Sequence, residues 1–129
     1  MLKVIASIQK VPYRIEIISA TKNVVIADEP LDKGGKDTGF SPKELLAAAL
    51  SACTSATLRM YVERKGWEIS EIKVETELTE ADNKTTFNQK IEFSEKIDEE
   101  KRNRLIQIAH ACPVHKILSN PIDFKTEIL

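Results

Sequence analysis

The sequence lacks an excess of charge of either sign. Lysine and arginine number 19 against 20 aspartate and glutamate residues, so the formal net charge at pH 7 is -1. A chain so nearly neutral has no overall field that would gather phosphate backbones or anionic lipid. We therefore expect no nucleic-acid partner.

Long hydrophobic runs and a targeting segment are also missing. No stretch reaches the roughly 18 consecutive apolar residues that suggest a transmembrane helix. The amino-terminal residues show neither an apolar core nor a small-residue cleavage pattern. We expect a cytoplasmic protein with no membrane partner. The 129 residues, 42% of them hydrophobic, fit a single α+β domain spanning residues 1–129.

Cysteine occurs only twice, as Cys53 and Cys112. Structural disulfides are rare in the cytoplasm, so the two residues are core side chains, metal ligands or redox groups. A structural zinc site normally contains two cysteines within a few residues of each other, whereas these lie about sixty apart. We therefore expect no metal and no cofactor. A hydrolase with Cys53 as nucleophile lacks a local group to orient its base.

Glycine is scarce too, and three of the four glycines fall between Asp32 and Gly39. Their spacing matches no phosphate-binding motif, so we predict a mobile loop or lid. Before this loop, runs rich in valine and isoleucine predict strands at 2–11, 13–19 and 23–27.

The clearest local signal is Ser41-Pro42-Lys43-Glu44, a capping box with proline at the first helical position. It predicts a helix from Pro42 to Lys65, ended by Gly66. Small and apolar residues surround its first four turns, so we expect a central helix buried on all sides. Its apolar run is too short for a bilayer.

The remaining chain predicts a hairpin of strands at 69–78 and 85–93, because apolar and charged residues alternate there. An amphipathic helix at 98–111 follows, which Pro113 interrupts. A short helix at 114–118 and a last strand at 123–129 complete the α+β order.

The two cysteines have unlike surroundings. Cys53 lies inside the central helix, where apolar burial raises a thiol pKa and where cysteine often serves as a small hydrophobe. Cys112 directly precedes Pro113, so its thiol can stand at a helix N-cap, which lowers a thiol pKa. His115 and Lys116 could add positive charge nearby. The alternative for Cys112 is a simple break between two helices, with cysteine as a filler residue.

The stretch from Gly34 to Thr54, followed by Gly66 and by Ala111-Cys112-Pro113-Val114-His115-Lys116, resembles the OsmC/Ohr family of osmotically inducible and organic hydroperoxide resistance proteins. The resemblance implies an intertwined homodimer with a strongly curved antiparallel sheet packed on a long buried central helix. It places two active sites at the subunit interface.

By the same resemblance, Cys53 matches the peroxidatic cysteine and Cys112 the resolving cysteine. The implied activity is a thiol-dependent reduction of hydroperoxides, with an organic substrate preferred, in oxidative or osmotic stress defence. Cys53 becomes a sulfenic acid, Cys112 condenses with it to a disulfide, and a lipoyl- or thioredoxin-like dithiol reduces that disulfide.

Two positions depart from the family pattern. Members place a carboxylate directly after the helix-opening proline, where this chain has Lys43; Glu44 comes one residue later and is either that carboxylate or only the capping residue. Members also use an arginine from the amino-terminal strands to hold the thiolate. Arg14 is the only arginine before the helix, and it either does this or faces solvent.

These departures keep a second class of function open: a non-enzymatic small-ligand-binding or stress-response protein with the same fold. An inert domain with two core cysteines is a third. The enzyme requires a lowered pKa at Cys53 and a disulfide to Cys112, whereas a binding protein requires only a pocket.

Overall fold

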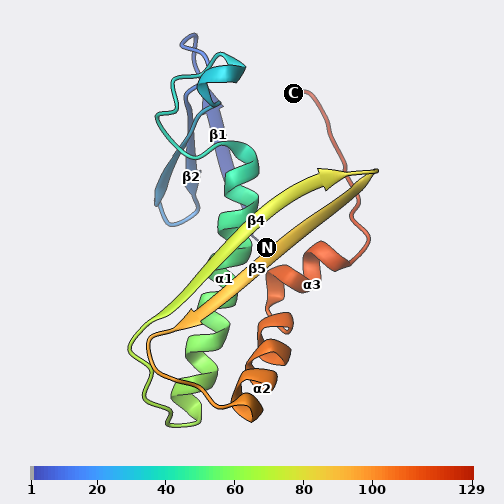
Figure 1. The fold of residues 1–129 in the computed structure, drawn as a ribbon. Coiled ribbons are helices and arrows are strands. Elements are labelled where there is room, and N and C mark those ends of the chain that lie inside the picture. The colour runs from blue at the N-terminus through green and yellow to red at the C-terminus, as the bar shows by residue number, and fades with distance from the viewer. Residues whose placement is uncertain (1) are drawn as a thin grey trace. The chain divides into compact units, whose positions relative to one another are not determined.

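The computed structural model describes residues 2–129 and shows an α+β fold of antiparallel sheets and helices (Figure 1). In chain order the elements are β1 (Val4–Ile8), β2 (Ile15–Ser19), β3 (Val24–Ala27), the short 3-10 helix η1 (Leu31–Lys33), α1 (Pro42–Arg64), β4 (Ile72–Ala81), β5 (Lys84–Phe93), α2 (Glu99–His110) and α3 (Pro113–Ser119). The chain divides into two compact units, which meet between Leu46 and Ala47 within α1. Each unit is described by itself.

The predicted strand at 123–129 is the one element that does not form. Residues 121–129 carry no strand or helix and are exposed. Ile122, Phe124 and Ile128 still alternate with polar residues, which is the pattern of a strand with one buried face. A strand forms only where another strand offers a free edge, and the described residues provide no partner for this segment.

The amino-terminal unit contains an antiparallel sheet in the order β1-β2-β3. Val4 pairs with Ser19 at one end of the β1-β2 ladder, and Ile15 pairs with Ala27 in the β2-β3 ladder. Large apolar side chains remain exposed on this sheet, among them Val4, Ile5, Ile8, Val24 and Val25. The unit by itself therefore leaves an uncovered apolar surface.

The glycine-containing loop after β3 is held by a buried carboxylate. Asp28 is 1% exposed and accepts hydrogen bonds from Thr38 Oγ1 at 2.5 Å and from the amides of Thr38 and Glu29 at 3.1 and 2.8 Å. A Cβ atom on Gly35 would lie 1.9 Å from the Glu29 carbonyl oxygen, so only glycine fits there. Gly35 thus serves close packing, and the expected mobility of this loop stays a prediction.

Helix α1 begins where the capping box predicts. The Ser41 amide donates to Glu44 Oε1 at 2.9 Å, and the Glu44 amide donates to Ser41 Oγ at 3.2 Å. At the other end the helix stops at Arg64, and Gly66 adopts a φ of +71°. Both predicted ends are confirmed to within one residue.

The burial of α1 is one-sided, which corrects the expectation of a helix buried all round. The buried side chains are Leu50, Thr54, Leu58, Tyr61 and Val62. Ala49, Ala52, Ala56 and Met60 form an exposed stripe along the opposite side, with Met60 60% exposed. The neighbours that a single chain supplies to the carboxyl-terminal part of α1 cover one face only.

Helix α1 also contains a long apolar window. An 18-residue window has a mean hydropathy of 1.3, enough by length and composition to cross a membrane. The expectation that its apolar run is too short was therefore wrong. The core helix of a soluble protein can have the same length and hydropathy, and 28% of this window is buried within the chain.

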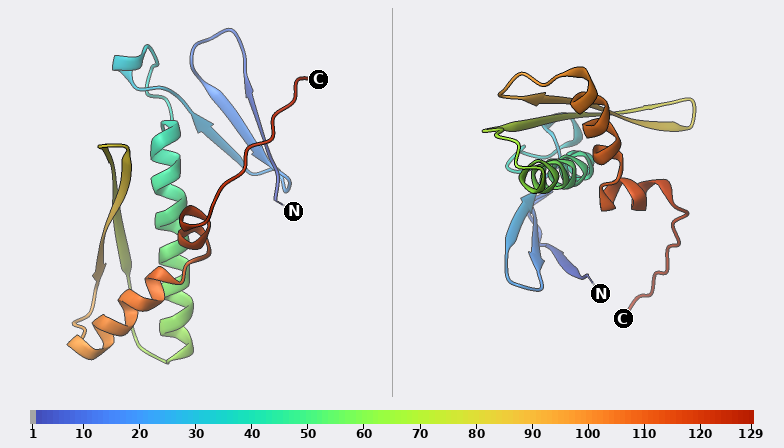
Figure 2. Two further views of the ribbon diagram at one scale, coloured as in Figure 1. Left: turned by 90° about the vertical axis from the view of Figure 1, so that its right-hand side faces the viewer. Right: turned by 90° about the horizontal axis from the view of Figure 1, so that it is seen from below.

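In the carboxyl-terminal unit, the hairpin of β4 and β5 lies along α1, and α2 lies beside the last turns of α1 (Figure 2). The hairpin pairs Ile72 with Phe93 and continues to Ala81 opposite Lys84. Alternate residues face α1 and the others face solvent, as the sequence pattern predicts. The core contains Leu58, Tyr61, Val62, Ile69, Leu105 and Ala109.

Candidate active site

The structure brings the two cysteines together although about sixty residues separate them. Cys53 is half-buried on α1, and Cys112 is fully buried at the start of α3. The Cys112 thiol lies near enough to the Cys53 thiol to interact with it, and the Val114 amide donates to Cys53 Sγ at 3.5 Å. Both thiols are free. The partly exposed sulfur thus lies beside a buried one.

Cys112 is the N-cap of α3, as the Cys-Pro pattern predicts. Its Sγ accepts a hydrogen bond from the His115 amide at 3.5 Å, and Pro113 occupies the first turn. On either side of Cys112, the rings of His110 and His115 stack with centroids 5.0 Å apart and planes inclined by 22°. This contact joins the end of α2 to α3 and helps to fix the turn that carries Cys112.

The surroundings of Cys53 raise the pKa of its thiol. Burial is the largest cause, and the hydrogen bond with the Cys112 thiol is the next. The Val114 amide and a hydrogen bond from the Thr57 side chain act in the opposite direction, because both favour the thiolate. The chain by itself therefore favours the protonated thiol, contrary to the lowered pKa that the enzyme interpretation requires.

The structure gives Glu44 a capping role. Its carboxylate accepts the Ser41 amide, and this bond lowers the pKa of the carboxyl group. At about 100° per residue, the nine positions between Glu44 and Cys53 place the two side chains on opposite sides of α1. Arg14 is exposed and directly precedes β2 in the amino-terminal unit. A role of Arg14 in holding the Cys53 thiolate stays a prediction.

A polar network lies next to Cys53, between α1 and the hairpin. Gln89 Nε2 donates to Thr54 Oγ1 at 3.1 Å and to Thr76 Oγ1 at 3.3 Å. Ser51 Oγ lies 2.7 Å from Thr76 Oγ1. These side chains are half-buried or buried, so the network fixes the side of α1 that faces the hairpin.

Two residues at the site were missed by sequence reasoning. Thr57 follows Cys53 by four positions, so helical spacing alone could have indicated it. The Val114 amide has no such signal, because the contact depends on how α3 packs against α1. Among residues 2–129, no group of three or more histidine, cysteine, aspartate or glutamate side chains could hold a metal ion.

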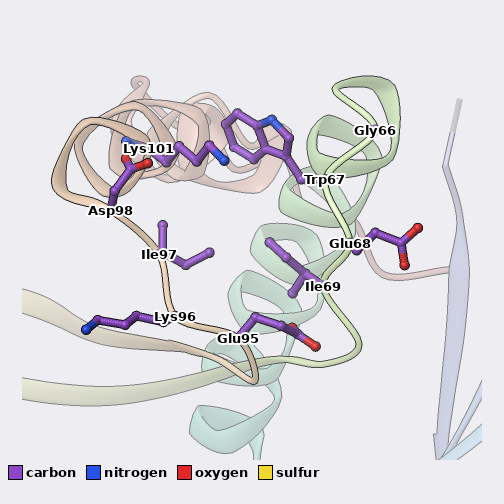
Figure 3. Close-up of a pocket in the computed structure, with 9 residues that line it drawn as sticks. All are labelled: Gly66, Trp67, Glu68, Ile69, Glu95, Lys96, Ile97, Asp98 and Lys101. Carbon is purple, nitrogen blue, oxygen red and sulfur yellow. Dashed lines mark hydrogen bonds between the residues drawn. The ribbon is translucent and has the colours of Figure 1, made fainter.

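A separate groove of about 540 Å³ opens at the carboxyl-terminal end of α1 (Figure 3). Trp67, Ile69 and Ile97 form its apolar part, and Glu95, Lys96 and Asp98 lie around it. Lys101 Nζ lies 4.8 Å from the centre of the Trp67 ring. The groove thus combines apolar and charged side chains.

A family model described as OsmC-like protein matches residues 34–127 of the chain. This range contains both cysteines, the capping box and the Cys-Pro turn. No curated protein gives a significant match.

Several solved structures have the same fold. An osmotic stress induced and detoxification response protein from Psychrobacter arcticus aligns with a TM-score of 0.78 and 25% identity over 91% of this chain and 88% of that one. An OsmC-like protein from Mycoplasma pneumoniae aligns with a TM-score of 0.72 and 18% identity over 92% and 87%. The organic hydroperoxide resistance protein OhrB of Bacillus subtilis aligns with a TM-score of 0.65 and 24% identity over 95% and 93%.

Proposed function

We propose that this chain, which belongs to the OsmC-like protein family, is a thiol-dependent peroxidase that reduces organic hydroperoxides in oxidative or osmotic stress defence. The observation that carries the proposal is the contact between the half-buried Cys53 thiol and the buried Cys112 thiol. One similar structure, from Bacillus subtilis, is that of an organic hydroperoxide resistance protein, which agrees with this proposal.

The exposure of the two sulfurs suggests which of them meets the substrate. Cys53 is partly accessible, whereas Cys112 is 0% exposed. In the proposed reaction the Cys53 thiolate attacks one oxygen of the hydroperoxide. The S–O bond forms as the O–O bond breaks, the alkoxide takes up a proton and leaves as an alcohol, and Cys53 is left as a sulfenic acid.

Cys112 then resolves this intermediate. Its sulfur attacks Cys53 Sγ, a disulfide forms, and water leaves with the sulfenic oxygen. A dithiol of the lipoyl or thioredoxin type returns both thiols to the reduced state and is itself oxidised to a disulfide. A disulfide that is reduced again in every catalytic cycle is compatible with the reducing cytoplasm expected from the sequence.

The apolar residues beside Cys53 favour an organic substrate. Ala49, Ala56 and Met60 lie on the same side of α1 as Cys53 or next to it, at helical spacing, and are exposed in the single chain. The hydrocarbon part of a hydroperoxide gains by contact with such a surface, whereas hydrogen peroxide does not.

An intertwined homodimer is part of the proposal. The stripe of Ala49, Ala52, Ala56 and Met60 and the apolar surface of the β1-β2-β3 sheet are both uncovered in a single chain. Contiguous apolar surface of this kind marks a protein interface. We further propose that Arg14 supplies the positive charge that lowers the pKa of Cys53 when the site is complete.

The test is peroxide consumption by the reduced protein with an excess dithiol, comparing cumene hydroperoxide with hydrogen peroxide. We expect turnover by the unchanged protein, none by Cys53→Ser, and a stalled or overoxidised Cys53 in Cys112→Ser. Ala81→Ser, which introduces a serine at the exposed end of the hairpin, is the control and should consume peroxide as the unchanged protein does. Equal inactivity of all four proteins would contradict a peroxidase.

The groove at Trp67 favours a second candidate, a non-enzymatic protein that binds small ligands. Trp67 is the only tryptophan in the sequence and lines the groove, so its fluorescence reports occupancy directly. Amphipathic ligands should quench or shift this emission if the groove binds them. A chain that binds in this assay and consumes no peroxide would favour the second candidate.

A further inference from the structure

We propose that the Thr57 hydroxyl and the Val114 amide together stabilise the Cys53 thiolate, which makes Thr57 a catalytic residue of this site. The inference rests on the proposed function, because it names the donors to the proposed nucleophile. It needs no residue outside the carboxyl-terminal unit, since all three lie after Ala47.

The helix itself positions Thr57. It follows Cys53 by four residues, so the two side chains lie one turn apart on the same face of α1. Thr57 is half-buried, and its side chain lies near enough to the Cys53 sulfur to lower the pKa of the thiol. A hydroxyl can donate to a thiolate, which has no proton of its own to offer, so ionisation strengthens this contact.

Val114 supplies a donor from a different element. Its amide lies in the first turn of α3, where amides have no acceptor within the helix, and it points to Cys53 Sγ at 3.5 Å. The neighbouring His115 amide is directed to Cys112 Sγ instead. Each sulfur thus has its own backbone donor.

The two hydrogen-bond donors oppose the effects that raise the pKa of the Cys53 thiol. Burial and the contact with Cys112, the titratable group that touches Cys53, both work against a charged Cys53. Hydrogen bonds to the charged form oppose them without introducing a formal charge. Two donors that converge on one sulfur from α1 and α3 are therefore what the thiolate requires from this chain.

The test measures Cys53 ionisation and not turnover. Alkylation of the reduced protein with iodoacetamide is followed across pH, and peptide mass spectrometry separates Cys53 from Cys112. Thr57→Val keeps the shape of the side chain and removes the hydroxyl, Thr57→Ser keeps the hydroxyl, and Ser55→Ala removes a hydroxyl that bonds to the Ser51 carbonyl instead.

We expect Thr57→Val to slow Cys53 alkylation at pH 8 roughly tenfold and to move its midpoint upward by about one pH unit, as the loss of one charge-assisted hydrogen bond predicts. Thr57→Ser and Ser55→Ala should behave as the unchanged protein. A folded Thr57→Val protein with an unchanged midpoint would overturn the role of Thr57.

Amide NMR of the unchanged protein gives a second measurement that does not depend on the folding of a variant. The Val114 amide proton should shift with the Cys53 midpoint, and this titration should vanish in Cys53→Ser. A Val114 amide shift that does not change as Cys53 ionises would overturn the role of Val114. Neither assay needs peroxide, so both test the thiolate donors independently of turnover. A protein that shows the expected shifts but consumes no peroxide would refute the proposed peroxidase activity and leave the role of the two donors standing.

Discussion

Gln89 Nε2 donates to Thr54 Oγ1 at 3.1 Å, so the middle of β5 is hydrogen-bonded to α1 one residue after Cys53. Thr54 is fully buried, and the same amide group also reaches Thr76 on β4. Both strands of the hairpin are therefore joined to the side of the helix next to Cys53. A polar network in such a place fixes one packing of the helix, provided that its members stay satisfied.

Thr54→Val should destabilise the protein by about 1–3 kcal/mol, because the half-buried Gln89 amide loses the Thr54 hydroxyl as an acceptor. Replacing both partners, as Thr54→Val with Gln89→Leu, should cost less than the two single changes added together. Chemical denaturation of all three proteins measures the difference. Thr79→Val, at an exposed position of the same hairpin, is the control. Strict additivity would show that the network contributes no coupling.

Leu58→Ala should be more damaging. Leu58 is 0% exposed within the core between α1, the hairpin and α2, and emptying such a site costs about 2–5 kcal/mol. Leu31→Ala makes the same chemical change at a side chain that is 73% exposed, and it should cost less than about 0.5 kcal/mol. Urea unfolding curves provide the measurement. Equal effects would mean that the core lies elsewhere.

Ala56→Glu should disrupt the proposed homodimer. Ala56 lies in the middle of the exposed stripe on α1, and an interface of small apolar residues excludes an unpaired carboxylate. Analytical ultracentrifugation should detect a loss of dimer, with helical content checked by circular dichroism. Thr79→Glu adds the same charge on the solvent face of the hairpin and should leave association unchanged. A chain that stays dimeric with Ala56→Glu would exclude this stripe from the interface.

Asp28 predicts an acid-dependent loss of stability. Hydrogen bonds from Thr38, with those from the Glu29 and Lys36 amides, lower the pKa of this carboxyl from 3.8 to about 2. A carboxyl with a lowered pKa stabilises the fold fully above its unfolded value, so its contribution is complete above pH 3.8 and is lost as the pH falls toward 2.

Thermal unfolding between pH 2 and 6 should therefore show a weaker acid dependence in Asp28→Asn. Asp32→Asn, in the exposed η1 turn of the same loop, is the matched control and should keep the dependence of the unchanged protein. If Asp28→Asn and the unchanged protein lose stability in parallel, the carboxylate does not anchor the loop.

Glu44 can be tested by separating its charge from its capping bond. Glu44→Gln keeps an acceptor for the Ser41 amide, so we expect a normal melting temperature and normal peroxide turnover. Glu44→Ala loses the acceptor and should melt at a lower temperature. A Glu44→Gln protein that folds normally but loses turnover would instead assign the carboxylate to the reaction.

Local signals in the sequence determined the elements of this fold. The capping box at Ser41, the stop at Gly66 and the thiol before Pro113 each act through dihedral preferences and hydrogen bonds within one turn of helix, so the surrounding fold cannot easily override them. The resemblance to the OsmC/Ohr family paired Cys53 with Cys112. The residues by themselves left core, metal and redox roles open.

Only the tertiary structure decided what surrounds Cys53. The Val114 amide and the Cys112 thiol reach it from about sixty residues away, and no short-range pattern encodes a contact between segments that packing alone brings together. Packing also decided that one side of α1 stays exposed, although its sequence is small or apolar all round. A helix can bury only the faces that its neighbours cover, and one chain covers a single face.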